Sequence, residues 1–230
     1  MPRIEEPTAP TEGLEDMVRR VDPDRWLSSR FIGDAATRAD VVAIYAYDHE
    51  LARAPKVATS ALLGEIRLTW WREALDEIYE NRPVRAHPGA QALARCVEHR
   101  SLPREVLETM IDARYRELDP AAMSEAELLD WARDTGGLSA QLAAQILDPA
   151  TEARMALAGG SAWALGKRLP ESPELRPTFL KVIHAARSAS RALSVAAFPA
   201  IAHAALAGRP SKSDFARRLR LTLAVARGRI

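Results

Sequence analysis

Two pairs of carboxylates stand at helical spacing within one acidic segment of the sequence. Glu73 and Glu77 are four residues apart, as are Asp76 and Glu80, so the members of each pair lie on one face of a helix. Oxygen anions in this arrangement could hold a divalent cation. Arg72 precedes Asp76 by four residues, and charged helix ends of this kind typically form weak surface ion pairs, so we favour that interpretation over a metal site.

His49 and Cys96 are the residues whose types suit acid-base or nucleophilic chemistry. No second His or Cys stands at the spacing of a metal site or catalytic triad around His49, so we interpret it as a structural or solvent-exposed side chain. Arg95 and His99 could lower the pKa of Cys96, but a lone cysteine beside apolar residues is typically a small core residue. A single cysteine excludes an internal disulfide and fits a reducing compartment.

The composition is that of a globular protein. Of 230 residues, 47% are hydrophobic and 27% are charged, which supports a substantial core. The formal net charge of +1 gives no strong attraction to polyanions, so we expect no nucleic-acid partner. The weakly polar residues 193–208 fall short of the roughly 20 apolar residues that a spanning helix needs. No apolar stretch follows Arg3, so we predict no signal peptide and a cytoplasmic location.

Apolar residues recur at helical spacing, and no segment keeps the alternation of a half-buried strand, so the predicted fold is all-α. Residues 1–12 are rich in Pro, Glu and Thr and are predicted to form a flexible tail before one helical domain, residues 13–230. Pro, Gly and capping residues predict helices over residues 34–54, 59–80, 88–99, 103–119, 124–146, 150–169 and 177–208, then a last helix capped by Ser211 or Ser213.

Capping residues and prolines place several of these helix ends. Asp34 is a suitable N-cap for its helix, which we expect to end before Pro55. Ser124 and Glu127 form a capping box, the clearest helix start in the chain. Pro199 is predicted to kink a helix that otherwise continues to residue 208.

Two patterns concern helix packing. The helix over residues 59–80 has an apolar stripe so wide that we predict burial on more than one side. The main apolar face of that helix comprises Leu62, Leu63, Ile66, Trp70 and Ala74. The glycine pairs at residues 136–137 and 159–160 each interrupt a predicted helix, which indicates close approach of another backbone or of a ligand.

Several strings together resemble the squalene/phytoene synthase family. They are residues 44–47 (IYAY), 70–76 (WWREALD), 82–84 (RPV), 111–119 (IDARYRELD), 131–142 and 160–165. Glu117 stands where the family usually has an Asp. The resemblance covers roughly residues 22–230 and implies a helical bundle of the isoprenoid synthase type. Such enzymes join two allylic diphosphates head to head, with carboxylates on two facing helices holding Mg²⁺.

The first acidic motif of the family is degenerate in this chain. When residues 44–47 are matched to the string that precedes it, the metal-binding aspartates fall at Ala52 and Lys56, with Arg53 beside them. No Asp or Glu occurs over residues 51–64, so a small shift in register forwards does not restore the motif. These residues cannot ligate Mg²⁺, which takes hard oxygen ligands.

The second acidic motif is also missing. No Asp or Glu occurs over residues 153–170, and Lys167 and Arg168 stand where the motif should follow the helix. Without either cluster the diphosphate cannot be ionised by the family's mechanism, so the resemblance implies a non-catalytic member with no metal site and no cofactor. An enzyme remains an alternative if Asp48 or Glu50 supplies ligands to Mg²⁺, although residues two apart point about 200° apart on a helix.

The resemblance also implies partners. Some divergent family members are not enzymes, including a factor that assembles respiratory complex I, so we expect a protein partner in respiratory or quinone-dependent complex assembly. A retained cavity would suit a prenyl or quinone lipid, and a lipid carrier is therefore a further alternative. The residues expected to line this cavity are Tyr45, Asp48, His49, Trp131, Thr135, Gly136 and Trp163.

The last helix is basic and amphipathic. Its basic residues are Lys212, Arg217, Arg218, Arg220 and Arg227. Such a helix can lie on an anionic membrane surface or dock on its own domain with its charges in water, and we favour docking. Peripheral contact with the inner membrane through this helix is the alternative.

Overall fold

The computed structural model describes residues 11–58, 60–209 and 213–230. Every regular element in these ranges is helical, which confirms the predicted all-α fold. The α-helices are α1 (Thr11–Val21), α2 (Pro23–Ser29), α3 (Ala35–Lys56), α4 (Ala61–Tyr79), α5 (Pro88–Arg100), α6 (Arg104–Tyr115), α7 (Glu125–Ala132), α8 (Leu138–Leu147), α9 (Leu157–Arg168), α10 (Arg176–Ala189) and α11 (Asp214–Arg227). The π-helical turn η2 (Arg133–Gly137) joins α7 to α8, and the 3₁₀ turns are η1 (Arg116–Leu118), η3 (Ala153–Ala156), η4 (Pro173–Leu175), η5 (Ser190–Ala192), η6 (Phe198–Ala200) and η7 (Ala202–Leu206).

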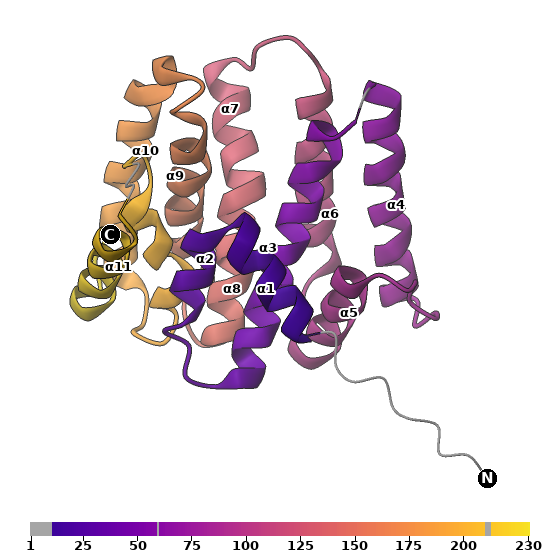
Figure 1. Cartoon of the computed structure of the whole chain (residues 1–230), viewed down its shortest axis with the longest axis horizontal. Helices are drawn as coiled ribbons and strands as arrows, with labels where there is room; N and C mark the ends of the chain where they lie inside the picture. Colours follow the sequence, from indigo (N-terminus) through magenta and orange to yellow (C-terminus); the bar gives the residue numbers. More distant parts are fainter. Residues whose placement is uncertain (1–10, 59, 210–212) are drawn as a thin grey trace.

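Helix α3 runs through the middle of the bundle (Figure 1). It packs against α1, α4, α5, α6 and α8, and the largest group of buried apolar side chains surrounds it. A second group of buried apolar side chains lies between α7, α9 and α10, to the left of α3 in Figure 1. The central position of α3 means that a polar side chain on its inner faces must find a partner inside the bundle.

The structure confirms the two helix starts predicted from N-caps and corrects one start and one end. The helix predicted to begin at residue 150 begins at Leu157 as α9, after the 3₁₀ turn η3. Asp34 accepts a hydrogen bond from the backbone N–H of Thr37, and Ser124 and Glu127 form the capping box. Helix α3 continues through Pro55 to Lys56, so the predicted end at residue 54 is wrong. The last turn still closes because the N–H of Val57 donates to the carbonyl of Arg53 at 3.1 Å. Helix α1 begins at Thr11, inside the predicted tail, and residues 1–10 lie outside the described residues.

The predicted burial of α4 is wrong on one face. Leu62, Leu63 and Ile66 are 64%, 44% and 55% exposed. Gly64, Leu68, Trp71, Ala74 and Leu75 form the buried face instead. Figure 1 shows α4 at the edge of the bundle, so only one side of this helix meets a neighbour. A wide apolar stripe therefore does not establish burial on more than one side.

The last third of the chain is less regular than predicted. Helix α10 ends at Ala189 and the backbone becomes extended at Leu193, before Pro199 is reached, so the predicted kinked helix to residue 208 is wrong. Short 3₁₀ turns bury this small-residue segment against the bundle. Ser213 caps α11 by accepting from the N–H of Ala216, whereas Ser211 and Lys212 lie outside the described residues.

The two glycine pairs allow η2 and α9 to touch backbone to backbone. A Cβ at Gly136 would lie 2.5 Å from the carbonyl oxygen of Gly160 and 2.9 Å from the Cβ of Ala164. A Cβ at Gly160 would in turn overlap the carbonyl of Gly136. The predicted close approach is confirmed, and it joins one glycine of each pair, Gly136 and Gly160.

We predict that Gly136→Ala destabilises the protein by about 1–3 kcal/mol, because the new methyl group overlaps backbone atoms that cannot rotate away. Gly33→Ala is the matched control, since no atom lies within 4 Å of a Cβ there, and its effect should stay below about 0.5 kcal/mol. Urea unfolding followed by circular dichroism measures both. Equal stability of the two variants would contradict the tight packing of η2 on α9.

Candidate functional site

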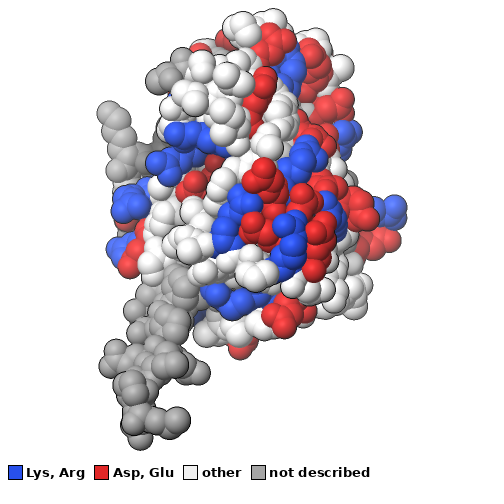
Figure 2. All heavy atoms as spheres, turned by 90° about the vertical axis from the view of Figure 1, so that its right-hand side faces the viewer, with Lys and Arg blue, Asp and Glu red and all other residues white. Residues whose placement is uncertain are grey.

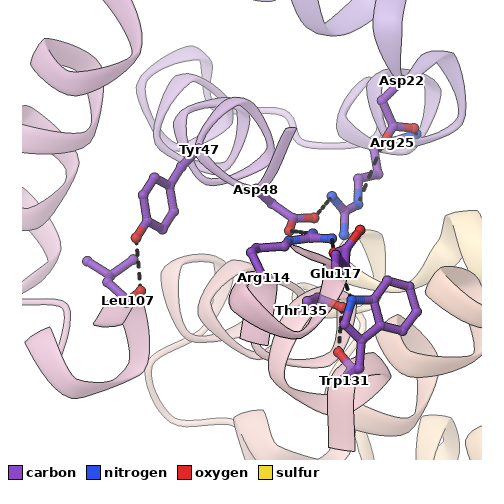
Figure 3. Close-up of polar contacts among 9 residues, drawn as sticks. All are labelled: Asp22, Arg25, Tyr47, Asp48, Leu107, Arg114, Glu117, Trp131 and Thr135. Atoms are coloured by element: carbon purple, nitrogen blue, oxygen red, sulfur yellow. Dashed lines mark hydrogen bonds and ion pairs between the residues drawn. The ribbon is translucent and has the colours of Figure 1, made fainter. Parts of the chain in front are cut away.

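The Asp48 carboxylate of α3 is buried in the middle of the bundle (Figure 3). One of its oxygens accepts from Nη1 of Arg25 at 2.5 Å, and the other accepts from Nη2 of Arg114 at 2.6 Å. The three side chains are 1–6% exposed. Arg25 comes from α2 and Arg114 from α6, so one carboxylate ties two other helices to α3.

A second carboxylate extends this contact into a network. Glu117 accepts from Nη1 of Arg114 at 2.6 Å and from the indole N–H of Trp131 at 2.8 Å. Thr135 donates to the carbonyl of Trp131 at 2.7 Å, at the start of the π-helical turn. We call Arg25, Asp48, Arg114 and Glu117 the central ion-pair network. It contains two cations and two anions, and a further buried carboxylate, Asp22, lies 3.9 Å from Nε of Arg25.

Aromatic rings enclose the Arg25 end of the network. The Arg25 guanidinium carbon lies 3.8 Å from the centroid of the Trp163 ring and 5.0 Å from that of Tyr45. His203 of η7 meets both rings edge to face. A desolvated guanidinium gains from such ring contacts, so the aromatic side chains stabilise the cation that Asp48 binds.

The environment sets the protonation of these groups. Burial raises the pKa of Asp48, but Arg25 and Arg114 outweigh this effect and hold the pKa at about 2. Burial lowers the pKa of Arg114, yet Asp48 and Glu117 raise it above its ordinary value. Burial and the nearby Arg25 hold the pKa of His203 well below its usual range, so this imidazole is neutral at pH 7. Asp48 and Arg114 are therefore charged and lie near a neutral histidine.

Most of the residues expected to line a cavity gather around this network. Asp48 is part of it, and Trp131 donates to Glu117. Thr135 donates to the backbone carbonyl of Trp131, and Tyr45 and Trp163 flank Arg25. Gly136 lies one residue further along η2, against α9. His49 is half-buried and makes no hydrogen bond or ion pair to the network within the described parts of the chain.

The acidic segment of α4 forms surface ion pairs, as we favoured. Glu73 and Glu77 pair with Arg85, Asp76 with Arg104, and Glu80 with Arg82. Arg72 pairs with Asp112 of α6 rather than with Asp76, which corrects the expected partner. Figure 2 shows this face covered by intermixed positive and negative side chains. Within residues 11–58, 60–209 and 213–230, no cluster of three His, Cys, Asp or Glu residues could hold a metal ion.

Cys96 is a core residue, as interpreted from the sequence. Its side chain is fully buried and its thiol donates to the carbonyl of Asp40 at 3.6 Å. Burial raises the pKa of the thiol to about 12. The thiolate, which is the nucleophilic form, is therefore scarce at neutral pH.

The positions of the degenerate acidic motif do not fit Mg²⁺. Arg53 and Lys56 are exposed cations, and Arg53 lies 3.7 Å from Glu50, on a different face of α3 from Asp48. Both oxygens of Asp48 already accept from guanidinium groups. A Mg²⁺ ion takes hard oxygen ligands in a near-octahedral array, and cations at these places oppose it.

The fold and the interior define a class of protein: an all-α bundle of the isoprenoid synthase type, in which an ion-pair network occupies the centre. A family model for squalene/phytoene synthase matches residues 18–169. The chain belongs to the squalene/phytoene synthase family.

The curated relatives that match this chain share one name. The Bos taurus protein named "NADH dehydrogenase (ubiquinone) complex I, assembly factor 6" is 28% identical over 133 residues, which are 57% of this chain and 39% of that protein. The Homo sapiens and Mus musculus proteins of the same name are both 27% identical over the same shares. The match thus spans well under half the length of these relatives.

Sequence reasoning identified Asp48 and Glu117 but not the partners that define them. Arg25, Arg114 and His203 were not predicted to be buried, because arginine and histidine are commonly on the surface. Arg114 lies in the string at residues 111–119, which is the one sequence signal that pointed to it. Nothing in the sequence around Arg25 indicates its depth.

We predict that Asp48→Asn lowers the free energy of unfolding by about 3–5 kcal/mol at pH 7, because two buried guanidinium groups lose their shared anion. The difference from wild type should shrink by roughly 2 kcal/mol as pH falls from 4 to 2, since protonation of a carboxyl with a folded pKa of about 2 removes its stabilisation there. Urea unfolding at each pH measures this.

Glu80→Gln is the matched control, because the Glu80–Arg82 pair is more than half exposed on both sides. We expect a change of less than about 1 kcal/mol. A pH-independent difference between wild type and Asp48→Asn would show that Asp48 is not the titrating group.

Proposed function

We propose that this protein is a non-catalytic member of the squalene/phytoene synthase family that supports assembly of respiratory complex I and uses no metal cofactor. The observation that carries the proposal is the central ion-pair network. Asp48 bridges two buried arginines in the interior, and the acidic motif positions hold Ala52, Arg53 and Lys56. Diphosphate ionisation needs anionic ligands around a divalent metal, which this arrangement does not supply.

The assembly role rests on the names of the relatives. Three mammalian proteins named complex I assembly factor 6 match this chain over 133 residues. An assembly factor needs a stable shape and a surface for its partner rather than reactive groups. Buried salt bridges that fix the positions of α2, α3 and α6 are compatible with this requirement.

We predict that deleting the gene lowers the amount of assembled complex I, measured by native gels and NADH oxidation in membranes, while carotenoid and hopanoid content stays unchanged. The wild-type chain should restore complex I. Glu50→Gln should restore it equally well, because Glu50 is a half-buried surface carboxylate on α3 with Arg53 as its partner. If the wild-type chain restored complex I and Glu50→Gln did not, the result would favour the enzymatic alternative, in which Glu50 binds Mg²⁺.

The proposal that the protein is non-catalytic also predicts the behaviour of the purified protein. With farnesyl or geranylgeranyl diphosphate, Mg²⁺ and NADPH, it should form no squalene, phytoene or free diphosphate above background. Product formation that depends on Asp48 or Glu50 would overturn the non-catalytic assignment, whatever the deletion does to complex I.

We also propose that α11 contacts a membrane surface. No helix within the described ranges is long and apolar enough to cross a bilayer. Helix α11 docks on the bundle through Leu221 and Ala224, as favoured from the sequence. Its opposite face leaves Phe215, Leu219 and Leu223 exposed by 74%, 47% and 39%.

Basic side chains border this exposed apolar face. A helix turns by about 100° per residue, which places Arg218 on one side of this face and Arg220 and Arg227 on the other. Arg220 and Arg227 form no ion pair with any residue that the structure describes. An apolar strip between arginines suits the interface of a bilayer with anionic lipids.

We predict that the double variant Phe215→Glu and Leu219→Glu lowers binding to vesicles of phosphatidylcholine and phosphatidylglycerol by more than about tenfold, since burial of each side chain contributes about 1.5–3 kcal/mol. Co-sedimentation measures the bound fraction. Val195→Glu is the control, because Val195 is 90% exposed and lies outside α11. Equal losses in both variants, or no binding by wild type, would remove the membrane role of α11.

A further inference from the structure

A pocket of about 580 Å³ opens between α2, α9, the start of α10, η7 and α11. These elements lie together at the left of Figure 1, away from the ion-paired face of α4 shown in Figure 2. The volume lies in the range of sites that bind small organic molecules. Apart from Trp163, the residues around this pocket were not among those expected to line a cavity.

Cationic side chains dominate the polar part of the pocket wall. Lys167, Arg176, Arg209 and Arg217 line it together with one carboxylate, Asp24. Asp24 is held by Arg217, whose Nε lies 3.1 Å from a carboxylate oxygen. Within residues 11–58, 60–209 and 213–230, no acidic side chain lies within ion-pair distance of the other three cations. The pocket therefore has an excess of positive charge, which attracts anions.

The rest of the wall is apolar. Trp163, Leu169, Leu206 and Ala207 line the pocket and are less than one tenth exposed, so they form a firm floor. The ammonium of Lys167 lies 5.2 Å from the centroid of the Trp163 ring. A cation thus stands directly beside the apolar floor. An inorganic anion would contact the cationic side chains and leave the apolar floor uncovered.

We propose that this pocket binds a single-chain amphiphile with an anionic headgroup. Lys167, Arg176 and Arg209 hold the phosphate or carboxylate of the headgroup directly, without a metal ion. The first part of the apolar chain lies against Trp163 and Leu206. This site is independent of the proposed assembly role, because binding and complex I assembly are measured separately and either can fail alone.

The test uses the full chain and monomeric lipids below their critical micelle concentration, measured by isothermal titration calorimetry. Oleate and oleoyl lysophosphatidate should both bind, and their relative affinities identify the preferred headgroup. Oleoyl lysophosphatidylcholine and inorganic phosphate should each bind at least about tenfold more weakly, since one lacks net negative charge and the other lacks the apolar chain. Comparable binding of either would overturn the proposal, inorganic phosphate by marking an adventitious anion site only.

A pair of charge variants locates the site. Lys167→Gln with Arg209→Gln should weaken oleate binding by about tenfold, the effect of losing two exposed ionic contacts. Arg20→Gln with Arg67→Gln removes the same charge from exposed positions of α1 and α4, away from the pocket and from α11, and should change affinity by less than about twofold. Both variants lie on the surface, and thermal melting confirms that they fold. Equal weakening in the two variants would show nonspecific attraction and overturn the pocket assignment.

Discussion

The structure depends on one buried contact, the Asp48 carboxylate between the guanidinium groups of Arg25 and Arg114. A charge in the interior is tolerated only when it is paired and hydrogen-bonded, so this anion fixes how α2 and α6 lie against α3. Both carboxylate oxygens are used by the arginines. The residue that could most readily have served as an interior metal ligand is thereby committed to holding helices together.

Small residues make the rest of this arrangement possible. Gly136 and Gly160 bring η2 and α9 to backbone contact. The close approach places Trp163 of α9 over Arg25, while Trp131 just before η2 donates to Glu117. A side chain at either glycine would push α9 outward and separate the aromatic enclosure from the network. Helix packing and electrostatics are therefore coupled in this core, because the helices that the glycines bring together are also the ones that exclude water from the cations.

Features encoded within a few residues were predictable from the sequence, and features that depend on distant segments were not. Asp34 and Ser124 were assigned as caps because a cap and its N–H partner are three residues apart. Asp48 was placed at the cavity by its position after the string at residues 44–47, but its partners stand 23 and 66 residues away. The stripe on α4 misled because periodicity shows which faces are apolar and not which of them a neighbour covers. The glycine pairs predicted a close approach without identifying each other as partners.

The distribution of paired and unpaired charge gives the molecule two different sides. On α4 and α6 most of the carboxylates are paired with arginines, so that face has little net attraction for a charged partner despite its many charges. Around α9 to α11, Lys167, Arg209 and Arg220 lack such partners within the described ranges. A formal net charge of +1 thus conceals an uneven surface. Because these cations have no carboxylate within ion-pair distance in the described part of the chain, recognition of an anionic lipid on the cationic side is the interaction that this charge distribution favours.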